Sequence, residues 1–186
     1  MAIDDLIQDA GRRMDKSVEA AQTEFATLRT GRASPALLDR VQIDYYGQKT
    51  PLKQLATINT PEPRMLTIQP FDPNSVSAIE RAIQESDLGL TPSNDGKVIR
   101  LPIPQLTEER RKELVKVVRH MAEEGRVAVR NVRRDVMHHL KELVDKGEVG
   151  SDEEHRAEER VQKLTDDHTH KIDELLKRKE AEILEV

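Results

Sequence analysis

Leu101-Pro102-Ile103-Pro104-Gln105-Leu106-Thr107-Glu108-Glu109 is the stretch that decides the fold, because the prolines of the chain end inside it. Proline removes a backbone donor and clashes with the preceding turn of a helix. Thr107 is a good N-cap, and Glu108 and Glu109 suit the positive end of a helix dipole. The stretch therefore predicts that a helix begins after Thr107, and the pattern that follows carries it to about Lys146.

All nine prolines lie between Pro35 and Pro104. The segments 1–34 and 105–186 can therefore form long helices, whereas the segment between them cannot. Both outer segments place apolar residues at steps of three and four, but neither makes a convincing domain alone. We therefore expect one helical domain built from both outer segments, with a second domain inserted into it. Two adjacent stretches of chain would join them, which is the geometry of a hinge.

Three amphipathic patterns run along the outer segments. The first predicts a helix over residues 3–28 that ends near Gly31. A reversal is expected at Gly147 and Gly150, and Ser151-Asp152-Glu153-Glu154 matches a capping box at the start of the last helix. The expected inner stripe of the middle helix is Leu114, Val118, Met121, Ala128, Val132, Val136, Leu140 and Leu143.

The middle segment predicts a small domain of strands and one helix. Asp72 or Asn74 can cap a short helix that buries Val76, Ile79 and Ile83. Asn94-Asp95-Gly96 predicts a turn. Alternation and apolar runs predict strands at 41–45, 52–58, 65–68 and 98–101, with a break at Pro61-Glu62-Pro63.

The predicted fold class is therefore α+β with two domains. Residues 1–30 and 106–186 would form an antiparallel three-helix bundle. Residues 31–105 would form a small inserted β/α/β domain.

Composition excludes several classes of function. The chain has no cysteine, which rules out disulfides, thiol catalysis and cysteine-ligated zinc. Aromatic residues make up only 2%, so stacking recognition of single strands is not expected. The start of the sequence lacks the pattern of a signal peptide, and no apolar stretch is long enough to span a membrane. We therefore expect a cytoplasmic protein without membrane contact.

Positive charge is concentrated on one face of the helix that follows Thr107. The residues that share this face, called the basic stripe below, are Lys112, Lys116, Arg119, Glu123, Arg126, Arg130 and Arg133. One interpretation is that the arginines bind the phosphate backbone of a folded RNA. The other is a solvated face paired with nearby acidic residues, and charge alone slightly favours this second interpretation because the net charge is −5.

Metal binding and catalysis have little support in the sequence. His138 and His139 are adjacent, and His168 and His170 are two residues apart, so neither pair has the i, i+4 spacing of a helical zinc site. No phosphate-binding glycine loop or nucleophile elbow is present in the sequence. We therefore expect no metal, no cofactor and no enzymatic activity.

Several separated motifs resemble one family. The segment Leu28-Arg29-Thr30-Gly31-Arg32-Ala33-Ser34-Pro35 closely resembles the first domain junction of bacterial ribosome recycling factors. Asp44-Tyr45-Tyr46-Gly47 also resembles this family. Further matching motifs lie at residues 86–90, 105–112, 127–134 and 179–182, so the resemblance covers the whole chain.

The resemblance implies an L-shaped protein that binds the ribosome after peptide release. With elongation factor G and GTP hydrolysis by that factor, such proteins split the post-termination complex into subunits and release it from mRNA. The implied partners are large-subunit ribosomal RNA, bound by the helical bundle, and elongation factor G, met by the inserted domain. The protein would act as a monomer.

The resemblance also assigns residues to roles. The implied RNA-binding residues are Arg29, Arg32, Arg111, Arg130, Arg133 and Arg134. The hinge is predicted from the residues themselves, because the two chain crossings between the domains carry Gly31 on one side and the prolines on the other: the hinge residues are Thr30, Gly31, Arg32, Pro102, Pro104 and Gln105. Two other classes stay open beside this one. A coiled-coil scaffold or chaperone would need no basic stripe, and an RNA-binding arm of a synthetase-like assembly would need a catalytic domain.

Overall fold

Residues 2–185 are described by a computed structural model. The chain divides into two units. The helical unit consists of the described parts of Met1–Phe25 and Lys112–Val186, and the inserted unit is Ala26–Arg111. The division falls near the ends of two helices, whereas the sequence placed it after residues 30 and 105. The predicted α+β class, with a helical unit built from both ends of the chain, is confirmed.

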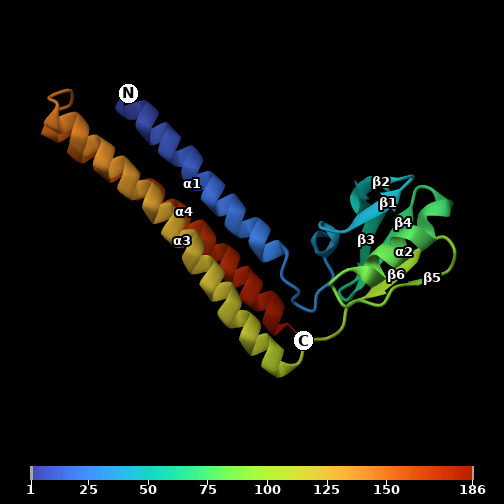
Figure 1. The fold of residues 1–186 in the computed structure, drawn as a ribbon. Helices are drawn as coiled ribbons and strands as arrows, with labels where there is room; N and C mark the ends of the chain where they lie inside the picture. Colours follow the sequence, from blue (N-terminus) through green and yellow to red (C-terminus); the bar gives the residue numbers. More distant parts are fainter. Residues whose placement is uncertain (1, 186) are drawn as a thin grey trace. The chain divides into compact units, whose positions relative to one another are not determined.

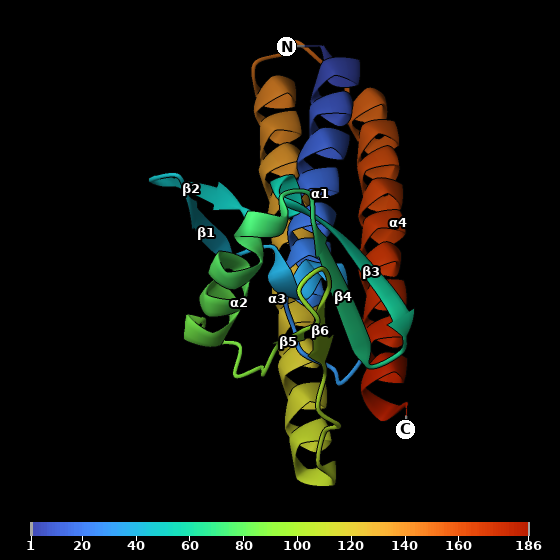
Figure 2. The same ribbon diagram turned by 90° about the vertical axis from the view of Figure 1, so that its right-hand side faces the viewer.

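Three long helices form the helical unit and lie side by side in both views (Figures 1 and 2). They are α1 (Ile3–Ala26), α3 (Glu108–Asp145) and α4 (Ser151–Leu184). Side-chain pairs fix their directions. Asp4 and Asp15 of α1 meet Arg160 and His168 of α4, whereas Arg119 and Arg133 of α3 meet Glu180 and Gln162 of α4 in the reverse order. Helix α1 therefore runs parallel to α4, and α3 runs antiparallel to both, as expected of a bundle with a tight α3–α4 turn.

The centre of α3 differs from the predicted inner stripe. Met121 and Ala128 are only half-buried, whereas Ala122, Gly125 and Val129 are buried. A Cβ atom added at Gly125 would lie 3.2 Å from Ile172 Cδ1 of α4 and 3.3 Å from Ala21 Cβ of α1. The prediction followed larger apolar side chains, but at Gly125 the side chains of α1 and α4 leave little room for any side chain.

The helix ends also depart from the sequence-based prediction at two points. Helix α1 ends at Ala26 rather than at residue 28, so Gly31 lies beyond the helix in a turn with φ +79°. Helix α4 has Gly150 as its N-cap, and Ser151 is already helical, so the predicted capping box does not form. The end of α3 is as expected: Gly147 N donates to Val144 O at 2.9 Å, and Glu148 N donates to Leu143 O at 3.0 Å, which is a Schellman motif.

One histidine is part of the helical core. His168 is only 4% exposed, its Nδ1 lies 2.6 Å from Leu164 O, and its Nε2 lies 2.7 Å from Asp15 Oδ1. Both ring nitrogens therefore face oxygen acceptors, and both can donate only when the ring carries two protons. The sequence interpretation gave this residue no role, and the structure makes it a polar link between α1 and α4.

Two antiparallel sheets and one helix form the inserted unit. The first sheet pairs β1 (Gln42–Tyr45) with β2 (Gln48–Pro51). The second sheet has the order β3-β4-β6-β5. Its strands are β3 (Ala56–Glu62), β4 (Met65–Pro70), β5 (Ser93–Asn94) and β6 (Ile99–Pro102). Helix α2 (Val76–Glu85) and three 3-10 helices, η1 (Pro35–Leu38), η2 (Leu52–Gln54) and η3 (Pro73–Ser75), complete the unit.

The core of the inserted unit joins α2 to both sheets. Ile79 and Ile83 of α2 are fully buried together with Ile43 of β1, Ile68 of β4 and Ile99 of β6. The predicted apolar face of α2 is thus confirmed. The predicted cap is not: Asp72 caps η3, where its side chain accepts from Asn74 N at 2.9 Å, whereas the N-cap of α2 is Ser75, which makes no side-chain capping bond. The unit therefore has a core of its own, made without the long helices.

Local chemistry explains where the predicted strands were wrong. Tyr46 and Gly47 both have positive φ, so they form the two-residue turn that creates the unpredicted strand β2. Leu52 begins a 3-10 helix instead of a strand. Strand β3 continues through Pro61, because it is an edge strand whose register with β4 shifts between Asn59 and Glu62. An edge or a bulge tolerates the missing proline N–H.

Candidate nucleic-acid interface

The predicted RNA-binding arginines fall in both units. Arg130, Arg133 and Arg134 lie on α3 within the helical unit, whereas Arg29 and Arg32 lie in the inserted unit. Arg111 lies in the first turns of α3, in the part of that helix that belongs to the inserted unit.

Part of the basic stripe is neutralised by acidic residues. Arg119 Nε donates to Glu180 Oε1 of α4 at 2.7 Å. Arg126 donates to Glu123 Oε2 at 3.0 Å and to Asp173 Oδ1 of α4 at 2.5 Å. These two arginines therefore link α3 to α4 by ion pairs, which is the solvated-face interpretation of the stripe.

Arg130 shares its carboxylate partner with Arg126. Its NH2 group lies 2.5 Å from Glu123 Oε1, about two turns earlier on the same face of α3. The hydrogen bond from Arg126, followed by that from Arg130, lowers the pKa of Glu123. One carboxylate thus meets two guanidinium groups, so Glu123, Arg126 and Arg130 together carry a net charge of about +1. Asp173 of α4, which pairs with Arg126, balances that charge.

Arg133 and Arg134 are placed differently. Arg133 NH1 donates to the neutral Gln162 Oε1 of α4 at 3.1 Å. Gln162 Nε2 in turn donates to Asp166 Oδ1 at 2.9 Å. Arg134 is exposed and makes no hydrogen bond or ion pair with residues 2–185. The two arginines thus form no direct ion pair within the described chain and present their charge at the surface.

Arg29 and Arg111, both in the inserted unit, differ in their hydrogen bonding. Arg29 NH1 donates to the backbone carbonyl of Leu88, beside Gly89, whose φ is +66°. Arg111 is half-buried, and its Nε has no hydrogen-bond partner among the residues that the structure describes. An unsatisfied buried donor is uncommon and is costly to leave without a partner.

Both connecting stretches of chain are anchored to one turn of the inserted unit. Ala33 N donates to Pro63 O at 2.7 Å, and Ile103 N donates to Arg64 O at 2.8 Å. Pro63 and Arg64 form the turn between β3 and β4. The two stretches are thus fixed to the inserted unit at residues 33 and 103. A hinge would therefore have to lie before residue 33 on the first stretch and after residue 103 on the second.

The predicted hinge residues differ in their local structure. Pro102 belongs to β6 and pairs with Met65, so it is part of the sheet rather than of a linker. Thr30 is buried, at 6% exposure, whereas Pro104 and Gln105 are exposed. Gly31 has φ +79°, and a Cβ atom there would lie 3.3 Å from Leu106 Cγ. Whether these residues act as a hinge stays a prediction.

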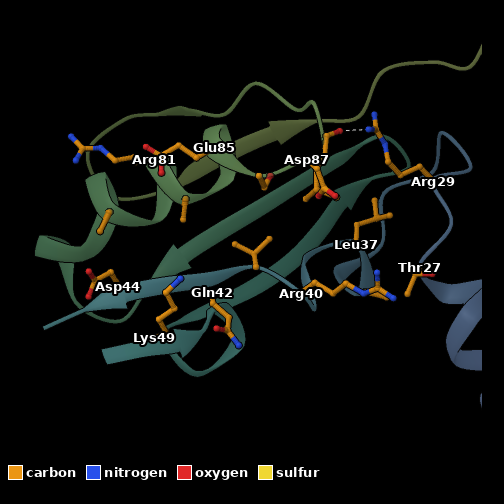
Figure 3. Close-up of a pocket in the computed structure, with 16 residues that line it drawn as sticks. Thr27, Arg29, Leu37, Arg40, Gln42, Asp44, Lys49, Arg81, Glu85 and Asp87 are labelled. Atoms are coloured by element: carbon orange, nitrogen blue, oxygen red, sulfur yellow. Dashed lines mark hydrogen bonds between the residues drawn. The ribbon is translucent and has the colours of Figure 1, made fainter. Parts of the chain in front are cut away.

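An open groove lies between α2 and the β1–β2 hairpin, with η1 at one end (Figure 3). Its volume is about 990 Å³. Arg40, Lys49, Arg81, Glu85 and Asp87 line it without an ion pair to any described residue. The dashed line in the figure is the hydrogen bond from Arg29 at the groove's edge. Charges of both signs could therefore be matched by complementary charges of a partner.

Sequence reasoning missed the α4 partners of the stripe. Gln162 and Asp173 were treated only as members of an acidic last helix, and Glu180 only as part of that helix and of the motif at residues 179–182. Their pairing depends on the register between two helices, which apolar spacing alone does not fix. The spacing could have indicated a shared face, because intervals of eleven and seven residues return to the same side of an α-helix.

No helix between residues 2 and 185 is long and apolar enough to cross a bilayer. The same residues contain no group of three or more histidine, aspartate or glutamate side chains placed to hold a metal ion.

Comparisons with known proteins agree over almost the whole chain. The family model for ribosome recycling factors matches residues 21–184. The ribosome-recycling factor of Rubrobacter xylanophilus is 61% identical over 180 residues, which cover 97% of this chain and 97% of that protein. A solution structure of a ribosome recycling factor is 46% identical and covers 100% of this chain and 99% of its own, with a TM-score of 0.81.

A further solved structure is described as the T. thermophilus ribosome recycling factor and E. coli elongation factor G bound to the E. coli post-termination complex. It is 49% identical, with a TM-score of 0.72, and covers 99% of this chain and 100% of that chain. These matches place the protein among the translation factors that are not enzymes. The chain belongs to the ribosome recycling factor family.

Proposed function

We propose that this chain binds the post-termination ribosome and, with elongation factor G and GTP, promotes its separation into subunits and its release from mRNA. The observation that carries the proposal is full-length similarity to a factor described on the post-termination complex together with elongation factor G. The GTP would be hydrolysed by the elongation factor, so this chain would need no catalytic residue. The reaction would take place in the cytoplasm.

The helical unit would contact large-subunit ribosomal RNA through Arg130, Arg133 and Arg134. Guanidinium groups suit phosphate, because they can donate two parallel hydrogen bonds. Arg134 is available without rearrangement, whereas a phosphate would have to share Arg130 with Glu123. Arg29, Arg32 and Arg111 of the inserted unit are proposed as further contacts, and the unsatisfied Arg111 Nε supports one of them.

The inserted unit would meet elongation factor G and pivot about the two connecting stretches. Thr30, Gly31, Arg32, Pro104 and Gln105 are the proposed flexible residues, with Pro102 as the fixed end of the return stretch. The anchoring of residues 33 and 103 to one turn supports this proposal, because these two residues would then move with the inserted unit and leave the bending to residues 30–32 and 104–105. The unpaired charges of the groove beside α2 offer a surface for the elongation factor.

Two measurements test the proposal. The purified chain, mixed with post-termination ribosomes, elongation factor G and GTP, should produce free subunits, and no splitting above the level without the chain would overturn the function. For the RNA site, Arg133→Ala should weaken binding to large subunits about tenfold, since a hydrogen bond to a charged group contributes about 1.5–3 kcal/mol. It should also lower the slope of log affinity against log salt by about one unit.

A control variant keeps the interpretation of Arg133→Ala specific. Lys163→Ala on α4 removes a charge that pairs with Asp167 on its own helix, so affinity should change little. Helical circular dichroism should be the same for both variants. If Arg133→Ala binds as tightly as the wild type and keeps its salt slope, the RNA site is wrong even if splitting occurs.

A further inference from the structure

The partners that α4 offers to the arginines of α3 are of two kinds. Arg119 and Arg126 meet carboxylates, Glu180 and Asp173, whereas Arg133 meets the neutral amide of Gln162. Gln162 thus occupies, on the same face of α4, the place that a carboxylate occupies at the other two positions. The exchange of a charge for a neutral group at this one position has a direct electrostatic consequence.

We infer that Gln162 is a positioning residue that orients the Arg133 guanidinium for RNA phosphate without neutralising it. The inference rests on the proposed function, because it deepens the role given there to Arg133. It adds a residue on α4 to a site so far built from arginines alone.

The geometry fixes which end of the Gln162 amide faces Arg133. Asp166 one turn later on α4 accepts from Gln162 Nε2 at 2.9 Å, and an ionised carboxylate can only accept. The amide oxygen is therefore turned toward Arg133 NH1, 3.1 Å away. Both Gln162 and Arg133 are half-buried, so this relay holds the guanidinium on a defined side of α3.

The charge balance explains why an amide serves better than a carboxylate here. Guanidinium carries five N–H donors, and one bond to Gln162 leaves enough for a bidentate contact with a phosphate. A carboxylate at residue 162 would form an ion pair with Arg133, and a phosphate would then have to displace it. Arg119 and Arg126, already paired in this way, contribute to α3–α4 contact instead.

The test measures binding of the full chain to purified large ribosomal subunits at several salt concentrations. Gln162→Glu should weaken binding about tenfold and lower the salt slope by about one unit, close to the values for Arg133→Ala. Gln162→Met keeps the length of the side chain but not its oxygen, so it should weaken binding about threefold with an unchanged slope. Gln22→Glu, on the exposed side of α1, is the matched charge control and should have little effect.

The double variant Arg133→Ala/Gln162→Glu separates positioning from general repulsion of RNA. If Gln162 acts through Arg133, the double variant should bind no more weakly than Arg133→Ala alone. An additional tenfold loss in the double variant, or wild-type binding by Gln162→Glu, would overturn the inference. Failure of Arg133→Ala itself to weaken binding would instead overturn the proposed RNA site. Thermal melting of every variant checks that the helical unit is folded.

Discussion

Gly125 is the position where the packing of the helical unit can be tested most directly. Alanine at this site would gain about 0.5–1 kcal/mol, because glycine is unfavourable in the middle of a helix. The added Cβ would however lie 3.2 Å from Ile172 Cδ1 and 3.3 Å from Ala21 Cβ, whereas carbon atoms prefer about 3.5–4.0 Å. Overpacking of this kind costs about 1–3 kcal/mol. We therefore predict that Gly125→Ala lowers the free energy of unfolding by about 1 kcal/mol.

A double-mutant cycle identifies the contact responsible. Ile172→Val removes the Cδ1 atom that is 3.2 Å from the new methyl group, and by itself should cost about 0.5–1.5 kcal/mol. In the double variant the loss of unfolding free energy should be smaller than the sum of the two single losses, by about 0.5–1 kcal/mol. The contact with Ala21 remains, so the rescue should be partial.

Urea unfolding followed by circular dichroism at 222 nm measures these differences, because the helical unit dominates that signal. For a chain of this size, 1 kcal/mol corresponds to about 2–4 °C in Tm. A Gly125→Ala variant that is more stable than the wild type by about 1 kcal/mol would show that helix propensity outweighs the contacts. Strict additivity in the cycle would show that Ile172 is not the obstacle.

Two further predictions concern the inserted unit. Gly31→Ala should destabilise the protein by about 1–2 kcal/mol, because Gly31 has φ +79° and the alanine Cβ would lie 3.3 Å from Leu106 Cγ. Gly11→Ala, where the added Cβ meets nothing within 4 Å, should instead stabilise it by about 0.5–1 kcal/mol in the same urea assay, and equal effects would refute the role of backbone angle. Hydrogen bonds from Val98 N, then Lys97 N, then Arg100 lower the pKa of Asp95 to about 2. Its stabilisation is thus complete above about pH 4 and is lost as the pH falls through 2, so Asp95→Asn should flatten the change in Tm between pH 4 and 2, and an unchanged pH profile would contradict this assignment.

The ends of the helices could be predicted from the sequence wherever a single residue, such as a proline or a capping threonine, determines them. The last proline at 104 and the cap at Thr107 located the start of α3, and Thr107 Oγ1 does accept from Arg110 N at 3.1 Å. The middle of α3 was not predictable in the same way. Gly125 faces inward because Ile172 and Ala21 leave no room for a side chain there, and the spacing of apolar residues carries no information about that room. Strand β2 was missed because Tyr46 adopts a positive φ that tyrosine rarely takes.

The candidate interface was predictable as a row of charges but not as a set of contacts. Spacing alone put Arg119, Arg126 and Arg133 on one face. Which of them would be neutralised depended on the residues of α4 opposite each one, and that register is set by packing of all three helices. Sequence spacing therefore found the surface, and only the structure separated the paired arginines from the unpaired ones.

Because the helical unit is discontinuous in sequence, its helices cannot all fold in the order in which they are synthesised. Helix α1 is made first, but its contacts join residues far apart in the chain: Asp15 with His168, and Asp4 with Arg160. The inserted unit is complete at Arg111, before either partner helix exists. At about 5–20 residues per second, roughly 4 to 16 s pass between the end of α1 and the start of α3, and more before α4 is made. During that time the apolar face of α1 has no native partner, so the helix that begins the chain is among the last elements to find its place.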